Sequence, residues 1–238
     1  MLKIDFHTHS IASGHAINTI YEMIHIAKNK GITHLGITEH GPAMEGAPHS
    51  GYFWISDQLT KLQGIDIFLG IESNIINQDG EIDLDKDLLS KQRIVSAGLH
   101  KKTPYDNCVN ANHTESIINA ISNPLVKIIT HPYRPEFPTD LEQIFYESYK
   151  NDTLLELNNN LFSYTNHLPE LIFNYTKLIK LCKKYNYPII VGSDAHIAEK
   201  IGDDTNIKLV QEKLDLPEEL IINNHYDTIL RYTNSIEV

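Results

Sequence analysis

Two histidines near the N-terminus stand one residue apart in the segment Asp5-Phe6-His7-Thr8-His9, and a third, His15, follows six residues later. The apolar start at residues 2–6 predicts a β-strand, and alternate residues of a strand point to the same side. His7 and His9 would then project together and could clamp a borderline metal ion such as zinc. Taken alone, such a pair is as often an accident as a metal site, so the rest of the chain must decide.

Further histidines and carboxylates recur directly after the apolar runs that predict strands. His40 follows the second run, Glu72 the third and His100 the fourth. In parallel β/α barrels the loops after the strands meet at one face, and active sites are built there. Accident does not readily explain so regular a placement. The candidate metal ligands are His7, His9, His15, His40, Glu72, His100, His131, Asp194 and His196.

This number of donors exceeds the needs of one ion, because zinc usually takes about four ligands and a catalytic site leaves one position open. The set therefore predicts two or three divalent ions. Glu72 is the natural bridge between them, since it is the glutamate of the set and offers two oxygens. Imidazole-rich donors with two carboxylates suit zinc, manganese or iron, and zinc is our first expectation.

Strands and helices alternate along the sequence without a linker or low-complexity segment. This alternation indicates one α/β domain over residues 1–238 with a parallel sheet, and seven short apolar strands favour a closed barrel. The expected strands are 2–6, 33–38, 65–71, 94–97, 126–130, 154–157 and 189–191. The expected helices are 19–31, which opens on a capping box, then 56–62, 112–121, 139–149, 168–184, 206–214 and 226–232, with a long loop at 44–56.

The composition limits the classes of partner. The formal charge of −11 argues against general affinity for nucleic acid or anionic membranes, because both attract lysine and arginine. Cys108 and Cys182 lie far apart without C-x-x-C spacing, which predicts free thiols in a reducing compartment. Asp5 and His7 interrupt the apolar start, and no apolar stretch has membrane length. We therefore expect a cytoplasmic protein without a membrane span.

The ordered motifs resemble the PHP (polymerase and histidinol phosphatase) superfamily over essentially the full length. Segments 45–49, 80–83 and 156–159 look like the small stand-alone phosphatases of the YcdX type. One departure is Glu39, where the family usually has aspartate, and its extra methylene bears on the support of the neighbouring histidine. The matching pieces are Asp5-Phe-His7-Thr-His9-Ser, His15, Thr38-Glu39-His40-Gly-Pro, Gly70-Ile-Glu72-Ser-Asn74, Ala97-Gly-Leu-His100, His131-Pro132 and Gly192-Ser-Asp194-Ala-His196.

The resemblance implies a distorted (β/α)7 barrel, similar to a TIM barrel, with a trinuclear metal centre at the C-terminal ends of its strands. Carried over position by position, the ligands fall into three sets. They are His7, His9, Glu72 and Asp194 for one ion, Glu72, His100 and His131 for a second, and His15, His40 and His196 for a third.

Clustered divalent ions lower the pKa of a shared water and neutralise the charge that develops on a phosphoryl group. We therefore expect hydrolysis of small phosphomonoesters, with metal-bound hydroxide as the nucleophile. Glu72, as the bridge, and Asp194, as a candidate proton donor, are the expected catalytic residues. No side-chain nucleophile is assigned, and metal-bound water could equally protonate the leaving group.

Other polar residues near the predicted site could contact substrate or support the ligands. Arg134, in the loop after the fifth strand, could clamp a phosphate oxygen or could be an exposed loop arginine. His49 could line the entrance, although solvent exposure is the simpler expectation, and Asn158 could donate to substrate or satisfy loop backbone. Asp5 is expected to orient a ligand imidazole, and Glu39 to support the histidine that follows it.

Two other functions stay open at this stage. One is a nuclease or phosphodiesterase that acts on nucleic-acid ends, although the acidic balance and the lack of a basic aromatic groove make nucleic acid a poor candidate partner. The other is a metal-binding protein without turnover. The sequence leaves the physiological substrate and the oligomeric state open.

Overall fold

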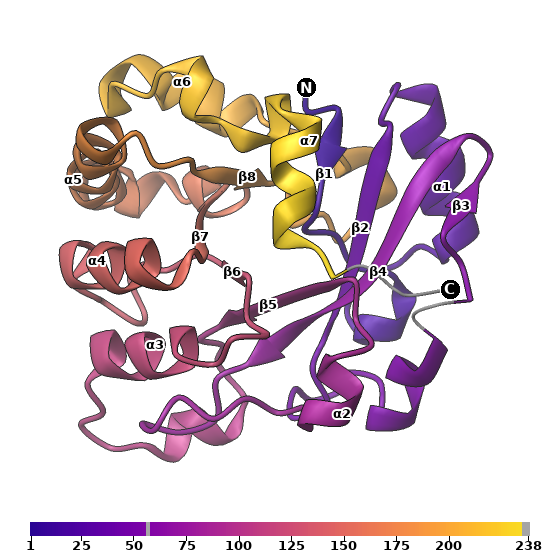
Figure 1. Ribbon diagram of the computed structural model, residues 1–238, viewed down its shortest axis with the longest axis horizontal. Coiled ribbons are helices and arrows are strands. Elements are labelled where there is room, and N and C mark those ends of the chain that lie inside the picture. The colour runs from indigo at the N-terminus through magenta and orange to yellow at the C-terminus, as the bar shows by residue number, and fades with distance from the viewer. Residues whose placement is uncertain (56–57, 235–238) are drawn as a thin grey trace.

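Seven parallel strands form the centre of the computed structural model, which describes residues 1–55 and 58–234 (Figure 1). Their order across the sheet follows the chain, and all seven lie where the sequence predicts strands. They are β1 (Ile4–Asp5), β2 (His34–His40), β4 (Ile65–Asn74), β5 (Ile94–Gly98), β6 (Ile128–Ile129), β7 (Leu154–Asn158) and β8 (Ile190–Gly192). That residues 1–238 form one domain stays a prediction.

The sheet curls into a nearly closed, distorted (β/α)7 barrel. The segments that continue β1 and β8 meet beyond the strands, where Thr8 and Ala195 form a parallel bridge. Farther back, the buried side chain of Asn223 joins the two strands. Its amide nitrogen donates to the carbonyls of Ile4 and Val191 at 3.0 and 2.8 Å, and its oxygen accepts from the Val191 amide at 2.8 Å. One side chain therefore takes the place of ladder hydrogen bonds at the barrel seam.

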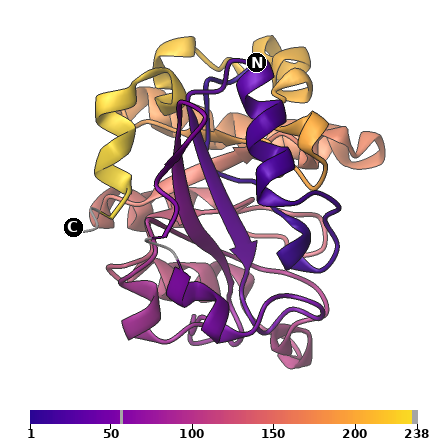
Figure 2. The ribbon, with the colours of Figure 1, turned by 90° about the vertical axis from the view of Figure 1, so that its right-hand side faces the viewer.

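Helices cover the outside of the barrel (Figures 1 and 2). The capping box predicted at the first helix is present, because Thr19 and Glu22 each accept from the other's backbone amide. In Figure 2 α1 lies beside β2 and β4, and its buried side chains belong to the apolar cluster on these strands. The helices are α1 (Ile20–Asn29), α2 (Lys86–Leu89), α3 (His113–Ile121), α4 (Leu141–Asn151), α5 (Leu168–Tyr185), α6 (Thr205–Leu214) and α7 (Tyr226–Ile229). None of the described helices combines the length and apolar character needed to cross a membrane.

The two ends of the barrel differ in character. An apolar cluster fills the interior at the N-terminal ends of the strands, and side chains of the C-terminal segment around α7 complete it. Figure 1 looks at this closed end. The opposite end carries the pocket described below, where the loops after the strands converge. The cluster contains Ile4, Phe68, Ile94, Ile128, Leu154 and Ile190 from six strands, with Ile222, Ile229 and Tyr232 from the C-terminal segment.

One predicted helix is wrong. Residues 56–57 of the expected helix 56–62 lie outside the described residues, and the described remainder ends in a short strand, β3 (Lys61–Leu62), antiparallel to β4. Gln63 and Gly64 connect the two strands with φ of 54° and 86°. Two left-handed residues form the two-residue turn that suits a hairpin, and a glutamine in the first position hides this signal. The expected loop 44–56 also contains a 3-10 helix (Ser50–Ile55).

Candidate metal centre

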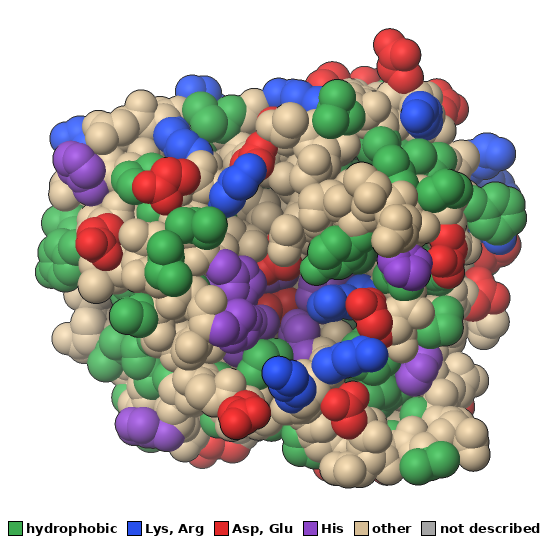
Figure 3. Space-filling model, turned by 180° about the vertical axis from the view of Figure 1, so that it is seen from behind, with side chains coloured by type: hydrophobic (Ala, Val, Ile, Leu, Met, Phe, Trp, Pro, Cys, Tyr) green, Lys and Arg blue, Asp and Glu red, His purple; other side chains and the backbone are tan. Residues whose placement is uncertain are grey.

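A pocket of about 430 Å³ opens at the C-terminal ends of the strands (Figure 3). Figure 3 shows histidines gathered around recessed carboxylates, with lysine and arginine side chains to one side. Residues from the ends of β2, β4 and β5 and from the loops after β6 and β8 contribute to its lining. The candidate ligands that line it are His15, His40, Glu72, His100, His131, Asp194 and His196.

Glu72 lies at the centre of the cluster and is fully buried. Its two carboxylate oxygens face different groups of imidazole rings, as a carboxylate that bridges two ions would. Oε1 lies 3.3 Å from His7 Nε2, 3.2 Å from His100 Nε2 and 3.0 Å from His131 Nε2. Oε2 lies 3.4 Å from His9 Nε2 and 3.0 Å from His40 Nδ1.

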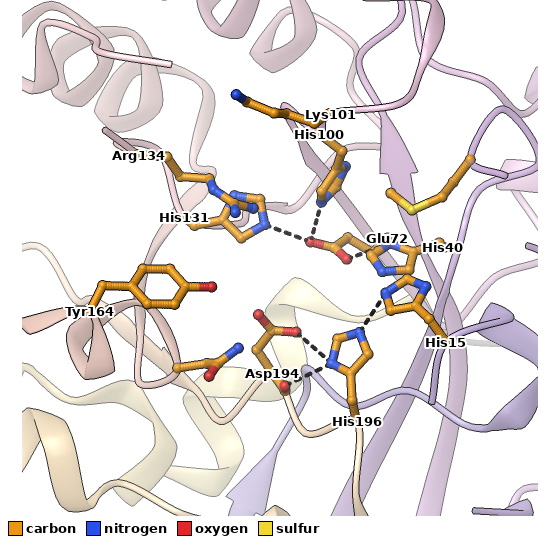
Figure 4. A pocket seen from close by; sticks show the side chains of 12 residues that line it. His15, His40, Glu72, His100, Lys101, His131, Arg134, Tyr164, Asp194 and His196 are labelled. Atoms are coloured by element: carbon orange, nitrogen blue, oxygen red, sulfur yellow. Dashed lines mark hydrogen bonds and ion pairs between the residues drawn. The ribbon is translucent and has the colours of Figure 1, made fainter. Parts of the chain in front are cut away.

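Asp194 is the second carboxylate of the cluster and lies on the side of the pocket opposite His100 (Figure 4). Its Oδ1 lies 3.6 Å from His7 Nε2 and 3.4 Å from His9 Nε2. Its backbone carbonyl lies 3.1 Å from His196 Nδ1, which must donate because a carbonyl can only accept. In a neutral ring the lone pair of His196 is then on Nε2, which lies 2.9 Å from Nε2 of His15.

Several buried nitrogen and oxygen atoms at the pocket floor, each able to act as a metal ligand, have no hydrogen-bond partner among the described residues. A buried polar atom without a partner costs about 1–3 kcal/mol, so a native structure rarely gathers several in one place. A cation bound between them would satisfy all of them at once. The residues present therefore fit a divalent metal site. The atoms are His7 Nε2, His9 Nε2, His40 Nδ1 and Glu72 Oε2.

Three groups of ligand atoms within the described residues are tight enough to hold an ion, each with its atoms within 4.8 Å of one another. His9 and His40 each belong to two groups, so the cluster is continuous rather than divided into separate sites. The assignment of each ligand to one of three ions stays a prediction. The groups are His9, His40 and His196; His7, His9 and Asp194; and His40, Glu72 and His100.

A carboxylate that the sequence did not assign holds the His7 ring. Oε1 of Glu156, on β7, lies 2.6 Å from His7 Nδ1, and its Oε2 accepts from the backbone amide of His131 at 2.9 Å. A ring that donates through Nδ1 presents the lone pair of Nε2 to the pocket. Glu156 therefore orients one candidate ligand and the backbone of another.

Glu39 supports the site by a route other than the expected one. Its carboxylate accepts from the hydroxyls of Ser10 and Ser13. Ser13 Oγ gives its proton to Glu39 and must accept from His9 Nδ1 at 3.1 Å, which leaves the Nε2 lone pair of His9 free for the pocket. Ser13 Oγ also accepts from the His40 amide at 3.1 Å, so Glu39 acts on the His9 ring and on the backbone of His40.

Asp5 does not orient an imidazole, contrary to the sequence-based expectation. Its buried carboxylate accepts from the backbone amides of His7 and Ser193 at 3.3 Å each and from Gly202 at 2.8 Å. Burial raises the pKa of this carboxyl group despite these bonds. Asp5 therefore holds the chain segments beside the barrel seam together and supports the site through its backbone.

The charges in the cluster are strongly coupled. Burial opposes the ionisation of Glu72, but His7, His100 and His40 outweigh it and hold the pKa of Glu72 well below its usual value. The same balance, with His7 and His9 as the leading partners, lowers the pKa of Asp194. Burial, followed by the neighbouring His40, lowers the pKa of His15 to about 4. Glu72 and Asp194 are therefore ionised at neutral pH, and ionised carboxylates attract cations.

Two candidate ligands adopt left-handed backbone conformations. His131 has φ of 32° and Asp194 has φ of 54°. Such values are uncommon outside glycine and cost free energy, and they cluster at functional sites where the surroundings enforce them. Here the Asp194 amide donates to the His7 carbonyl at 2.9 Å, and Glu156 holds the His131 amide.

Comparison with known proteins agrees with this geometry. The model of the PHP domain family matches residues 5–185, and that of the PHP-associated family matches residues 176–206. The chain belongs to the PHP family. A probable phosphatase of Clostridium novyi is 37% identical over 233 residues, covering 98% of this chain and 94% of the relative. A probable phosphatase of Shewanella sp. (strain MR-4) is 38% identical over 232 residues, covering 96% and 90%. These relatives place this PHP protein among the phosphatases.

Solved structures of two other proteins share the fold. Histidinol phosphate phosphatase from Lactococcus lactis, solved with zinc, L-histidinol and phosphate, superimposes with a TM-score of 0.58 at 17% identity and covers 89% of this chain and 92% of its own. A chain of archaeal ribonuclease P, solved with mature tRNA, reaches 0.60 at 12% identity and covers 97% and 94%. At these identities the likeness concerns the fold alone.

The three residues expected to contact substrate occupy different positions in this PHP protein. Arg134 lines the pocket. Asn158 is buried and uses its amide on the protein, because it donates to Glu156 and Asp194 at 3.2 Å each and accepts from the Leu161 amide. Its contacts are those of a residue that positions the two carboxylates. His49 is exposed, accepts from the Gly51 amide, and is not among the pocket-lining residues.

Other pocket-lining residues carried no motif that could have marked them. Lys101 directly follows His100, whereas Asn160 and Tyr164 come from the segment after β7. Lysine and tyrosine are frequent on any protein surface, so their types alone do not distinguish them. Only the position next to a ligand could have drawn attention to Lys101.

Proposed function

We propose that this PHP protein is a metal-dependent phosphomonoester phosphatase whose centre binds three divalent ions. The observation that carries the proposal is the arrangement of imidazole nitrogens around the two oxygens of buried Glu72, several of which make no hydrogen bond within the described residues. The full-length phosphatase relatives support the reaction class. The Lactococcus neighbour, which contains zinc and phosphate, supports zinc as the first metal to test.

Different side chains would bind the ions and position the carboxylates that hold them. Glu72 would hold two ions through its separate oxygens, and Asp194 would hold one of them together with the His7 and His9 rings. Bound divalent ions would supply hydroxide at neutral pH and neutralise phosphate charge. Asn158 donates to the other oxygen of Asp194 at 3.2 Å, which fixes the orientation of this carboxylate in the pocket.

The test is release of inorganic phosphate from a panel of small phosphomonoesters after loading with zinc, manganese or iron. The proposal expects turnover that depends on added metal, with a 5′-labelled single-stranded DNA left uncut under the same conditions. Cleavage of the DNA without phosphate release would favour a nuclease. Stoichiometric metal binding without turnover of any phosphate ester would identify a metal-binding protein without activity.

A further inference from the structure

The pocket above the cluster is asymmetric in charge. Its acidic lining residues, Glu72 and Asp194, lie at the floor, where the imidazoles surround them. The other charged lining residues are Lys101 and Arg134. A cationic rim stands out on a chain whose formal charge is −11.

Both cations lie on one side of the pocket. Lys101 follows His100 after β5, and Arg134 follows His131 after β6, and these two strands are neighbours in the barrel. Figure 4 shows the two side chains on the side of His100 and away from His15, with the Tyr164 ring on the adjoining wall. A ligand that reaches the centre of the cluster can therefore present a second group to Lys101 and Arg134 together.

The loops that carry these cations are fixed by their own hydrogen bonds. The Thr103 hydroxyl donates to the His100 carbonyl at 2.9 Å, which closes the turn containing Lys101. The Phe137 amide donates to the Arg134 carbonyl at 2.9 Å, which closes a turn at Arg134. The cations therefore start from defined backbone positions, which lowers the entropic cost of binding.

The side chains of Lys101 and Arg134 keep donor groups that make no hydrogen bond with the described residues. The exposed ammonium of Lys101 forms no hydrogen bond or ion pair with the residues that the structure describes. The Arg134 side chain is 24% exposed, and its buried Nε has no hydrogen bond within the described chain. Glu136 forms an ion pair with Arg134, with its Oε2 at 3.6 Å from Nε, but this distance is too long for a hydrogen bond. Donors are therefore available to a ligand.

Lys101 and Arg134 are not needed to neutralise the charge of the reacting phosphate. The divalent ions proposed above outweigh Glu72 and Asp194 in charge and would neutralise a phosphate at the floor without further help. We propose that Lys101 and Arg134 form a second anion subsite, so the preferred substrate is a small phosphate ester with a second phosphate or a carboxylate. Such a molecule suits a pocket of about 430 Å³, within the usual range for small-molecule sites. This inference rests on the proposed phosphatase function.

The test compares matched substrates. Glycerol 3-phosphate and 3-phosphoglycerate have the same number of carbon atoms and differ by a carboxylate, whereas fructose 6-phosphate and fructose 1,6-bisphosphate differ by a phosphate. With metal-loaded protein we expect kcat/KM to be at least about tenfold higher for the member of one pair that carries a second anionic group. This factor is the size of one charge-assisted hydrogen bond. The pair that shows the preference identifies the second group as carboxylate or phosphate.

Variants then assign the preference to the two cations. Lys101→Gln and Arg134→Gln should each reduce the ratio of the two kcat/KM values several-fold. Lys102→Gln, at an exposed neighbour outside the pocket, is the matched control and should leave the ratio unchanged. A parallel loss for both members of a pair would overturn the subsite, because the cations would then serve the reacting phosphate.

Binding of the same four compounds, measured by calorimetry on metal-loaded protein, separates this inference from the function on which it rests. One outcome is tighter binding of the member with a second anionic group, lost in Lys101→Gln, without turnover of any compound. This outcome would retain the subsite and reject the phosphatase. Turnover with equal kcat/KM for both members of each pair would retain the phosphatase and reject the subsite.

Discussion

The Nδ1 atom of His7 lies 2.6 Å from Oε1 of Glu156, so a carboxylate on β7 fixes a ring that follows β1. The contact is buried, and the other oxygen of Glu156 holds the His131 amide. Gly192 lies against it, because a Cβ at that position would be 1.9 Å from Oε1 of Glu156. The segments after β1 and β6 therefore depend on one side chain, which packs against the end of β8.

Glu156→Gln should weaken metal binding without unfolding the protein. Glutamine can still accept from His7 but carries no charge, and loss of such support typically costs about 10–100-fold in metal affinity or activity. Metal affinity measured by competition with a chelator checks this, with Glu212→Gln on the exposed face of α6 as the control. Unchanged affinity in Glu156→Gln would show that the His7 ring does not need its carboxylate.

Glu72→Gln should abolish turnover and retain the fold. The amide offers one oxygen in place of two, so the bridge is lost, and the rate should fall by more than the roughly 10–100-fold typical of outer residues. Phosphate release and circular dichroism check the two parts. Asp66→Asn, at the other end of β4, is the control and should keep full activity. An active Glu72→Gln protein would refute the bridging role.

Asn223→Ala should destabilise the barrel seam. It leaves the Ile4 carbonyl and both backbone groups of Val191 without their partner in a buried place, and each such group costs about 1–3 kcal/mol. We expect the free energy of unfolding to fall by about 2–5 kcal/mol in urea. Asn224→Ala is the neighbouring control, since the side-chain amide of Asn224 donates to Glu218 over long distances of 3.4 Å. A loss below about 1 kcal/mol would mean that water replaces Asn223.

The metal-free protein should lose stability on mild acidification. Burial, and then His40, lowers the pKa of His15 from 6.5 to about 4, and burial also lowers the pKa of His9. The unfolded chain then binds more protons than the folded chain between these values, so stability is fully present above about pH 6.5 and declines toward about pH 4. His7 shifts in the opposite direction and reduces the effect.

Thermal unfolding in the presence of a chelator, from about pH 7 to about pH 4.5, checks this expectation. The midpoint should fall across the range, and His15→Asn should reduce the slope because it removes one of the groups concerned. A midpoint that is constant or rises on acidification would show that His7 or other groups outweigh the lowered histidines.

The barrel and the candidate ligands could be predicted from the sequence because both follow from short-range patterns. A ligand such as His40 or His100 comes directly after an apolar run, and parallel strands bring such positions to one face whatever their distance along the chain. The helix expected at 56–62 failed because a hairpin turn at Gln63 and Gly64 overrides local helix propensity.

The residues that orient the ligands could not be predicted in the same way. Glu156 lies within an apolar strand, and no local pattern tells which ring it meets across the barrel. Asp5 stands beside His7 in sequence but bonds the backbone, so proximity along the chain suggested the wrong partner. Asn223 acts on strands at both ends of the chain, a relationship that exists only after the barrel closes.

The most direct test of the central claim is the metal content of the purified protein, measured by mass spectrometry together with phosphate release. Three divalent ions per chain are expected, with activity lost on chelation and restored by metal, and with fewer ions retained by Glu72→Gln. Less than one ion per chain after incubation with zinc, manganese and iron would contradict it, as would phosphate release that persists in metal-free protein.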